Sequence, residues 1–333
     1  MVTKKSAVIG EGSYGCVLRP QPRCKKTKLP STTKTVGKVI KKKNAEIELR
    51  ISALLKSIPG WENYYVVQEE DNCEPANFKE MQKEYSDDCK LFQDDTLRIN
   101  NLTQIVSKYG GKDLTVTTSN FDYMGTLKHV LIGIEKLQAQ GICHYDLKDN
   151  NMVSDEHGVV RLIDFGSAFV GDSATDTNVV QKIFHFLPEY NTFSPELSAQ
   201  HGLYHVKERP HSLKELYHDS IYKKSSLKLM ETILGVPREQ SKDKLVNFWA
   251  DYYKEHGDTE AGEFFRTYWR AWDTWAVGVI FLKILSRSLL NPSFVEKVWK
   301  PKGTVLKEVL RGLLAVDPRE RLSPGAALKM IGT

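Results

Sequence analysis

The chain reads His144-Tyr145-Asp146-Leu147-Lys148-Asp149-Asn150-Asn151, and thirteen residues after Asn151 it continues with Asp164-Phe165-Gly166. Asp146 can orient or deprotonate an attacking hydroxyl, and Lys148 can neutralise charge on a transferring phosphoryl group. Asn151 and Asp164 offer the oxygen ligands that Mg2+ prefers. This spacing of an acid, a cation and two oxygen ligands predicts a site for a Mg2+-bound nucleoside triphosphate.

Two short apolar runs lie between these groups. Asn151-Met152-Val153 and Val159-Val160-Arg161-Leu162-Ile163 have the composition of strands, and turn residues 154–158 separate them. We expect a hairpin that brings Asn151 and Asp164 close together.

These residues resemble the catalytic loop and the metal-binding turn of eukaryotic protein kinases. The family pattern H-R-D-L-x-x-x-N is met at His144, Asp146, Leu147 and Asn151, and D-F-G is met completely. Tyr145 stands where the family usually has an arginine, which in relatives pairs with a phosphorylated activation loop. The resemblance therefore implies a kinase whose activation does not rely on such a phosphate.

A glycine-rich segment near the amino terminus matches the family's G-x-G-x-x-G-x-V loop, which covers the phosphates. Alone, this triplet is as typical of dinucleotide-binding folds or turns, but a dinucleotide site needs an acidic residue about twenty positions on. The chain is basic and turn-rich there. The resemblance assigns nucleotide binding to Ile9, Gly10, Glu11, Gly12, Ser13, Tyr14, Gly15 and Val17.

Lys38 takes the place of the family's V-A-I-K lysine, although Val-Gly replaces the usual Ala-Ile before it. A helical stripe of apolar residues follows, at Ile47, Ile51, Leu54, Leu55 and Ile58. Glu48 borders this stripe and Glu46 lies further around the helix, so we select Glu48 as the carboxylate that holds Lys38 on the α and β phosphates. The alternative is that both glutamates are solvated charges.

Residues 104–114 read as a strand, a glycine-containing connector and a helix start. They resemble the hinge between the two kinase lobes, with the backbone of Lys108 and Tyr109 on the adenine edge and Ser107 as the gatekeeper. An ordinary strand-to-helix turn explains this segment almost as well when it is taken alone.

Three later motifs fall in the family's order: Ser194-Pro195-Glu196, residues 273–278 and residues 317–321 resemble A-P-E, D-x-W-x-x-G and the late arginine. By analogy, Glu196 and Arg321 form a buried ion pair. The resemblance implies an α+β, bilobal fold. Residues 1–108 form a small antiparallel lobe with one main helix and an acidic insertion at about 59–101, expected to be an extended loop. Residues 109–333 form a mainly helical lobe with an insertion at about 197–270.

The second insertion has aromatic residues at helical spacing. They could form a docking surface for a partner, or pack as an added helical layer, which is the commoner role of such stripes. The peptide-docking loop is also irregular. Where many relatives place a threonine that contacts the catalytic acid, this chain has Glu189, and Thr192 is offset.

Composition limits the alternatives. The net charge of +5 is modest, and the early lysines, including Lys41 to Lys43, are typical of a solvated rim. No aromatic-interleaved basic patch or zinc-finger spacing indicates nucleic-acid binding. The 5 cysteines are odd in number and lack C-x-x-C spacing, so we expect free buried thiols, no metal cluster and no disulfide framework. Without a signal peptide or a membrane-length apolar run, the chain is expected in a reducing, intracellular compartment, without membrane contact.

The resemblance as a whole implies a divergent serine/threonine protein kinase that uses ATP with Mg2+, or Mn2+, and phosphorylates a protein. Asp146 and Lys148 would be catalytic, and Asn151 and Asp164 would bind the metal. Lys148 resembles the serine/threonine branch, and the departures from the family resemble kinases of large DNA viruses. Two alternatives remain open at this point: a pseudokinase that recruits a partner through the 197–270 insertion, and a phosphotransferase for small molecules.

Overall fold

The chain forms two compact units. The computed structural model describes residues 6–12, 15–25, 32–68, 72–94, 96–115, 121–175, 177, 187–203, 209–257 and 261–332. Unit 1 comprises Met1–Lys112 with Val153–Ser167, and unit 2 comprises Asp113–Met152 with Ala168–Thr333. Unit 1 is built on an antiparallel sheet and unit 2 is mostly helical, which confirms the predicted α+β class.

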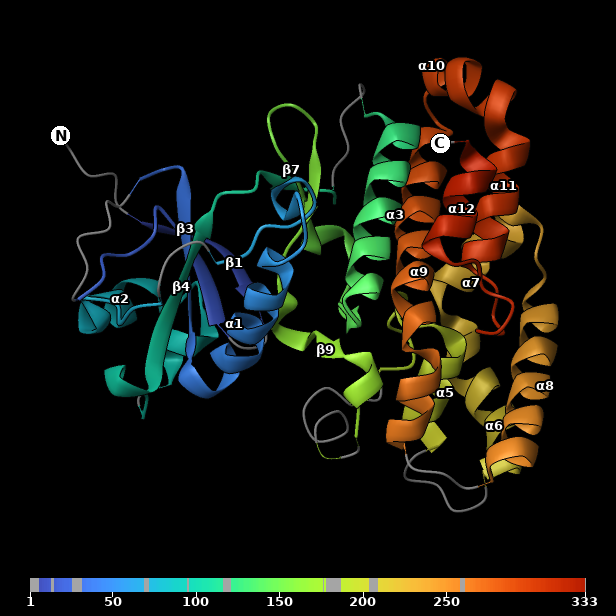
Figure 1. The fold of residues 1–333 in the computed structure, drawn as a ribbon, viewed down its shortest axis with the longest axis horizontal. Helices are drawn as coiled ribbons and strands as arrows, with labels where there is room; N and C mark the ends of the chain where they lie inside the picture. Colours follow the sequence, from blue (N-terminus) through green and yellow to red (C-terminus); the bar gives the residue numbers. More distant parts are fainter. Residues whose placement is uncertain are drawn as a thin grey trace. The chain divides into compact units, whose positions relative to one another are not determined.

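Unit 1 contains a four-stranded antiparallel sheet in the order β1-β2-β3-β4 (Figure 1). The strands are β1 (Ala7–Gly12), β2 (Gly15–Arg19), β3 (Thr35–Lys41) and β4 (Leu102–Lys108). A Cβ atom on Gly15 would lie 2.1 Å from the carbonyl oxygen of Val39, so only glycine allows β2 to approach β3 this closely. The strands therefore pack tightly just after the glycine-rich turn.

Helix α1 (Lys42–Lys56) follows β3 directly. Its buried residues are Ala45, Glu48, Ile51, Ser52 and Leu55. The predicted stripe is confirmed at Ile51, Leu55 and Ile58 but is wrong at Leu54, which is 37% exposed. The inward face is centred on Glu48 rather than beside it, because a carboxylate with a cationic partner can take a buried position.

The acidic insertion does not form the expected extended loop. It contains η1 (Trp61–Asn63), α2 (Phe78–Tyr85), η2 (Lys90–Gln93) and η3 (Ile99–Asn101). The apolar residues of α2 and η2 form a buried cluster with the sheet, made of Cys16, Leu18, Val39, Phe78, Met81, Tyr85, Cys89, Phe92 and Leu102. The sequence pattern did not predict this apolar set, because its members are spread over several short elements and lie among acidic residues.

Two disulfides fasten the same insertion and correct the prediction of free thiols. Cys16 of β2 is bonded to Cys89, and Cys24 to Cys73. Cys143 is free and buried, as expected. The paired cysteines are 73 and 49 residues apart, so their pairing depends on the tertiary path of the insertion and not on local spacing. The reducing, intracellular compartment stays a prediction.

The expected hairpin is present as β7 (Met152–Ser154) and β8 (Val160–Leu162), in a sheet of order β5-β7-β8 with β5 (Lys112–Asp113). Asp155 shapes its turn, because its carboxylate accepts hydrogen bonds from the backbone amides of His157 and Val159. The hairpin leads into η5 (Phe165–Ser167), which packs on α1 within unit 1.

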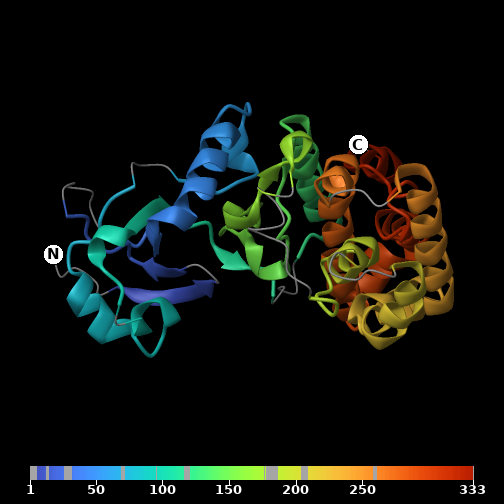
Figure 2. The ribbon, with the colours of Figure 1, turned by 90° about the horizontal axis from the view of Figure 1, so that it is seen from below.

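Unit 2 is a bundle around one long helix, α9 (Ala261–Ser288), which lies beside α3 (Tyr123–Ala139), α11 (Lys300–Leu313) and α12 (Pro324–Ile331) in Figure 1 and is seen from below in Figure 2. The other helices among the described residues are α5 (Pro195–Leu203), α6 (Arg209–Asp219), α7 (Ser225–Leu229), α8 (Arg238–His256) and α10 (Pro292–Phe294). Short 3-10 or π turns are η4 (Asp149–Asn151), η6 (Gly171–Ser173), η8 (Ile221–Lys223), η9 (Met230–Leu234) and η10 (Val295–Trp299). The one described sheet wholly within this unit pairs β6 (Ile142–Cys143) with β9 (Phe169–Val170).

The second insertion is an added helical layer. Most of its aromatic side chains are buried: Phe248, Trp249, Tyr252, Phe264, Phe265 and Trp269. The rings of Trp249 and Phe264 stack with centroids 5.1 Å apart, which joins α8 to α9. The insertion also ends inside α9, because this helix runs unbroken from Ala261 through the D-x-W-x-x-G motif at 273–278. The packing interpretation of the aromatic stripe is therefore the correct one.

Within the described ranges, no helix taken singly has both the length and the apolar character to cross a membrane. Helix α9 and the following Pro292–Leu313 meet those two criteria only when joined, with a 112° bend between them.

Candidate active site

In unit 1, a lysine lies between two carboxylates. Lys38 Nζ is 2.7 Å from Glu48 Oε2 and 2.6 Å from Asp164 Oδ1. Burial disfavours the charge on Lys38, but the two carboxylates outweigh it and raise the pKa of this lysine. Lys38 therefore stays cationic, as a contact to phosphate groups requires. The selection of Glu48 over Glu46 agrees with this geometry.

The backbone at Asp164 fixes this group. Its φ is 64°, in the left-handed region that a non-glycine residue adopts only when its surroundings enforce it. Phe165 is buried beside it, edge-on to Tyr65 with the ring centroids 5.9 Å apart. Gly166 lies against the same group, because a Cβ atom built on it would be 3.4 Å from Asp164 Oδ1, an ordinary contact distance. The D-F-G sequence thus aims the carboxylate at Lys38.

The sheet register places the nucleotide candidates around Lys38. Val17 and Ile105 are paired with Lys38 across the strands, and Gly10 is paired with Val17. Paired residues share one face of a sheet, so these four lie in one row. Gly12 is paired with Gly15 at the turn. Ser13 and Tyr14 lie outside the described residues.

Two of the loop candidates, Ile9 and Glu11, lie outside the row that holds Lys38. Glu11 Oε1 accepts a hydrogen bond from the backbone amide of Lys90, so its side chain is tied to the first insertion. Ile9 is 50% exposed, one position off the row that holds Gly10. Sequence matching could not separate these two residues from the rest of the motif.

The hinge prediction is only partly supported by the geometry. Ser107 is paired with Val36, two positions from Lys38, and therefore lies on the Lys38 face as a gatekeeper would. The backbone amide of Tyr109, however, donates to the carbonyl of Lys34 at 2.8 Å, and the Tyr109 ring lies under the guanidinium of Arg19. This amide is thus not an available donor for adenine. Lys108, paired with Thr35, lies at the exposed end of β4.

In unit 2, three side chains converge on Asp146. Lys148 Nζ donates to Asp146 Oδ2 at 2.8 Å, and Tyr190 donates its hydroxyl to Oδ1 at 2.7 Å. Asn151 Nδ2 donates to the Asp146 carbonyl at 2.8 Å. Because its nitrogen is used in this way, Asn151 presents its amide oxygen to other partners. An amide oxygen here and a carboxylate at Asp164 are donors that fit Mg2+.

The backbone of the catalytic loop is bound by Asp273, the first residue of the D-x-W motif. Its carboxylate accepts hydrogen bonds from the backbone amides of His144 at 2.7 Å and Tyr145 at 3.0 Å. Burial raises the pKa of Asp273. The sequence identified this motif but not its role, because the two amides lie about 130 residues away along the chain.

Tyr145, in place of the family arginine, is part of an aromatic cluster. Its ring lies within 6.0 Å, centroid to centroid, of the rings of Phe169, Phe193, Phe265 and Trp272. Its hydroxyl is 2.9 Å from His201 Nε2. The side chain is almost fully buried, so a packed aromatic cluster surrounds Tyr145.

The predicted ion pair lies at the end of the activation segment, where Glu196 follows Ser194 and Pro195. Arg321 forms a bidentate pair with Glu196, with distances of 2.8 and 2.9 Å, and both side chains are inaccessible to solvent. The prediction of this pair is confirmed. Sequence analysis missed Tyr190, since a tyrosine one position after Glu189 matches no family pattern.

Comparison with known families agrees with this arrangement. The profile of the protein kinase domain matches residues 3–197. The chain belongs to the protein kinase family. The part of this kinase that follows residue 197 contains the second insertion, the D-x-W motif and the late arginine.

Individual relatives match only parts of this kinase. Serine/threonine-protein kinase PSK2 of Saccharomyces cerevisiae is 56% identical over 41 residues, which are 12% of this kinase and 4% of that protein. Serine/threonine-protein kinase PSK1 of the same yeast is 39% identical over 71 residues, or 21% and 5%. Cyclin-dependent kinase 7 of Carassius auratus is 25% identical over 219 residues, or 66% and 55%. The kinase thus spans at most about half the length of these relatives.

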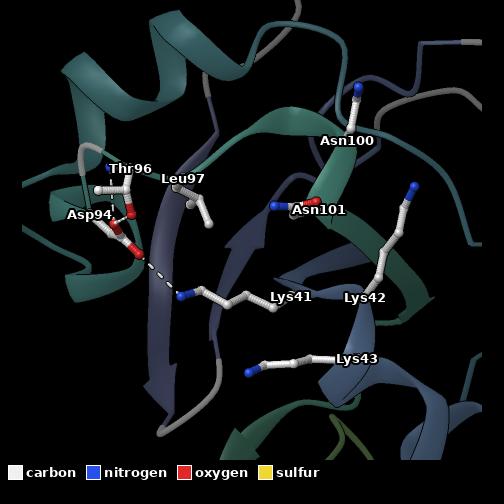
Figure 3. Close-up of a pocket in the computed structure, with 8 residues that line it drawn as sticks. All are labelled: Lys41, Lys42, Lys43, Asp94, Thr96, Leu97, Asn100 and Asn101. Atoms are coloured by element: carbon white, nitrogen blue, oxygen red, sulfur yellow. Dashed lines mark hydrogen bonds and ion pairs between the residues drawn. The ribbon is translucent and has the colours of Figure 1, made fainter.

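A separate hollow of about 440 Å3 lies at the start of α1 (Figure 3). It is lined by Lys41, Lys42, Lys43, Asp94, Thr96, Leu97, Asn100 and Asn101. Lys41 points to Asp94, with the two charged atoms 3.1 Å apart. Lys42 and Lys43 are exposed, in line with the predicted solvated rim.

Proposed function

We propose that this protein is an active serine/threonine kinase, which transfers the γ-phosphoryl group of ATP, bound with Mg2+ or Mn2+, to a hydroxyl of a protein substrate. The single observation that carries the proposal is that Lys38, Asp146, Asn151 and Asp164 are all present, with Lys38 paired to Asp164 in unit 1 and Lys148 and Asn151 bonded to Asp146 in unit 2. A pseudokinase commonly lacks at least one of them. The names of the yeast relatives and the position of Lys148 support the serine/threonine assignment.

Each residue has a physical task. Lys38, fixed as a cation by Glu48, binds the α and β phosphates. Asp146 orients the acceptor hydroxyl and takes its proton, and Lys148 neutralises charge on the transferring group. Asn151 and Asp164 would hold the metal, which supplies charge neutralisation on the phosphates. Catalysis then consists mainly of positioning and electrostatic stabilisation.

The test is incubation of the protein with labelled ATP, Mg2+ and generic acidic and basic proteins, followed by mass spectrometry of the acceptor side chains. We expect label on serine or threonine. Asp146→Asn should lower kcat by about 10²-fold or more with little change in ATP affinity, because only the acceptor contact is lost.

The outcome also separates the alternatives. Thermal stabilisation by ATP without any label transfer would favour a binding module. Transfer to small molecules with no labelled polypeptide would favour a small-molecule phosphotransferase. Equal turnover of the wild type and Asp146→Asn would contradict the role of Asp146.

A further inference from the structure

The loop of residues 187–193 carries a tyrosine hydroxyl to the proposed catalytic carboxylate. Tyr190 donates to Asp146 Oδ1 at 2.7 Å, while Lys148 donates to Oδ2 at 2.8 Å. Burial and the negative charge of Asp146 raise the pKa of Tyr190, so the hydroxyl keeps its proton and acts as the donor. Both oxygens of Asp146 are therefore oriented by a donor from this chain.

The second insertion holds this loop through its backbone. Lys224 Nζ donates to the carbonyl of Tyr190 at 2.6 Å. This lysine is 1% exposed, and the burial of a cation is costly unless its hydrogen bonds are satisfied. The hydrogen bond to the carbonyl of Tyr190 therefore fixes both Lys224 and the loop.

Asn191 is held from two sides. Its side-chain Oδ1 accepts hydrogen bonds from the amide of Ser226 at 2.8 Å and the hydroxyl of Ser225 at 3.0 Å, both in α7. Its carbonyl accepts from Trp275 Nε1 at 3.2 Å. Two consecutive loop residues are thus fixed by α7, by the residue that precedes it and by α9.

An aromatic chain connects the loop to the catalytic loop. Phe193 lies edge-on to Tyr190, with centroids 4.8 Å apart, and its ring is 5.1 Å from that of Tyr145. Tyr145 adjoins Asp146 in the sequence. Tyr190 is therefore connected to the catalytic acid in two ways, by its own hydrogen bond and through the packed rings of Phe193 and Tyr145.

From these contacts, and given the kinase activity proposed above, we propose that Tyr190 is a positioning residue, and that the 197–270 insertion holds it on Asp146 through Lys224 and Asn191. A carboxylate oxygen accepts more than one hydrogen bond, so Oδ1 can still receive the hydroxyl of a substrate. The bond to an ionised acceptor is of the strong kind, and it fixes the rotation of the carboxylate. The opposite role, in which Tyr190 blocks the acceptor position, predicts the opposite change in rate.

The first experiment compares Tyr190→Phe with the wild type and with Tyr217→Phe. Tyr217 is another tyrosine whose hydroxyl donates a hydrogen bond, in its case to the backbone carbonyl of Arg238 within the insertion, so this control removes the same hydroxyl at a place away from Asp146. We expect Tyr190→Phe to lower kcat roughly tenfold, as for the loss of one hydrogen bond to a charged group. The KM for ATP and the melting temperature should match those of Tyr217→Phe.

An unchanged kcat would overturn the positioning role, and a raised kcat would show that Tyr190 blocks the acceptor position. If the wild type transfers no phosphate at all, the proposed function fails and this inference with it. If the wild type is active and Asp146→Asn is not, a null result for Tyr190→Phe sinks this inference alone.

The second experiment tests the role of the insertion with Asn191→Ala and the double variant Tyr190→Phe/Asn191→Ala. If the insertion acts through Tyr190, Asn191→Ala lowers kcat, and the double variant is no slower than Tyr190→Phe. Independent, multiplying losses in kcat would contradict this role, as would a loss that appears only in the melting temperature. Asn191→Ala is preferred to truncation of Lys224, because truncation would leave an empty site where this buried side chain lies and would lower stability as well as kcat.

Discussion

The two insertions of this kinase are attached to the fold by different means. In unit 1, residues 72–94 are joined to β2 and to the segment that follows it by two disulfides, and to the sheet by a small apolar cluster. In unit 2, residues 197–270 are joined by buried aromatic rings and by continuity with α9. A short, acidic segment buries little apolar surface, and a covalent bond compensates for that. The first attachment can therefore be undone by reduction, whereas the second requires unfolding.

The largest expected contrast between the units concerns their ion pairs. Arg321→Met leaves Glu196 buried without its partner, and this should lower the free energy of unfolding by about 3 to 5 kcal/mol. Arg161→Met in unit 1 removes a partly exposed pair with Asp155 and should cost only about 0 to 1 kcal/mol. Urea denaturation of both variants measures the difference. Equal losses would mean that the buried pair is not the stronger anchor.

Reduction should affect unit 1 selectively. Opening the bonds Cys16–Cys89 and Cys24–Cys73 should destabilise that unit by about 2 to 4 kcal/mol per bond. Hydrogen exchange, followed by mass spectrometry with and without dithiothreitol, measures this locally. We expect faster exchange in residues 72–94 and no change in α8. Uniform protection in both states would show that the apolar cluster alone holds the insertion.

Lys224 gives the second insertion a pH dependence. Burial lowers its pKa from 10.5 to about 7, although Glu196 and Glu189 oppose this. Between about pH 7 and 10.5 the unfolded chain therefore binds a proton that the folded chain lacks, so the free energy of unfolding gains a contribution that rises with pH. Below pH 7 this contribution is constant. The free energy of unfolding of the wild type and of Lys224→Met is measured by denaturation at pH 7 and at pH 10. The difference between the two proteins should be larger at pH 10, and an equal difference at both pH values would refute the prediction.

The smallest expected effect is that of a phosphatase. Because Tyr145, which stands in place of the family's arginine, is packed among aromatic rings and offers no cation to a phosphate, dephosphorylation should leave kcat unchanged. The kinase is assayed before and after phosphatase treatment, with complete removal of phosphate verified by mass spectrometry. A fall of tenfold or more would mean that a phosphate contributes to activation after all.

Local patterns predicted a large part of the fold and the site. The hairpin between Asn151 and Asp164, the pair of Lys38 with Glu48 and the pair of Glu196 with Arg321 follow from motifs with fixed spacing. Such groups are set by short segments whose geometry repeats within a family.

Other features depend on contacts between distant segments, which no spacing reveals. The disulfides, the buried apolar set of α2 and the hydrogen bond from Tyr190 to Asp146 are of this kind. The hydrogen bond from the amide of Tyr109 to the carbonyl of Lys34 could not be predicted for the same reason, because Lys34 lies in the turn before β3, far from Tyr109 in the sequence.

The unbroken course of α9 restricts how the second insertion can be shortened. Each residue deleted from a helix turns everything beyond it by about 100° and moves it by about 1.5 Å. Deletion of a single residue between Ala261 and Trp272 would turn Asp273 away from the two backbone amides that donate hydrogen bonds to it. Trimmed forms of this protein should therefore lose length in whole turns of α9, or be cut before the helix begins.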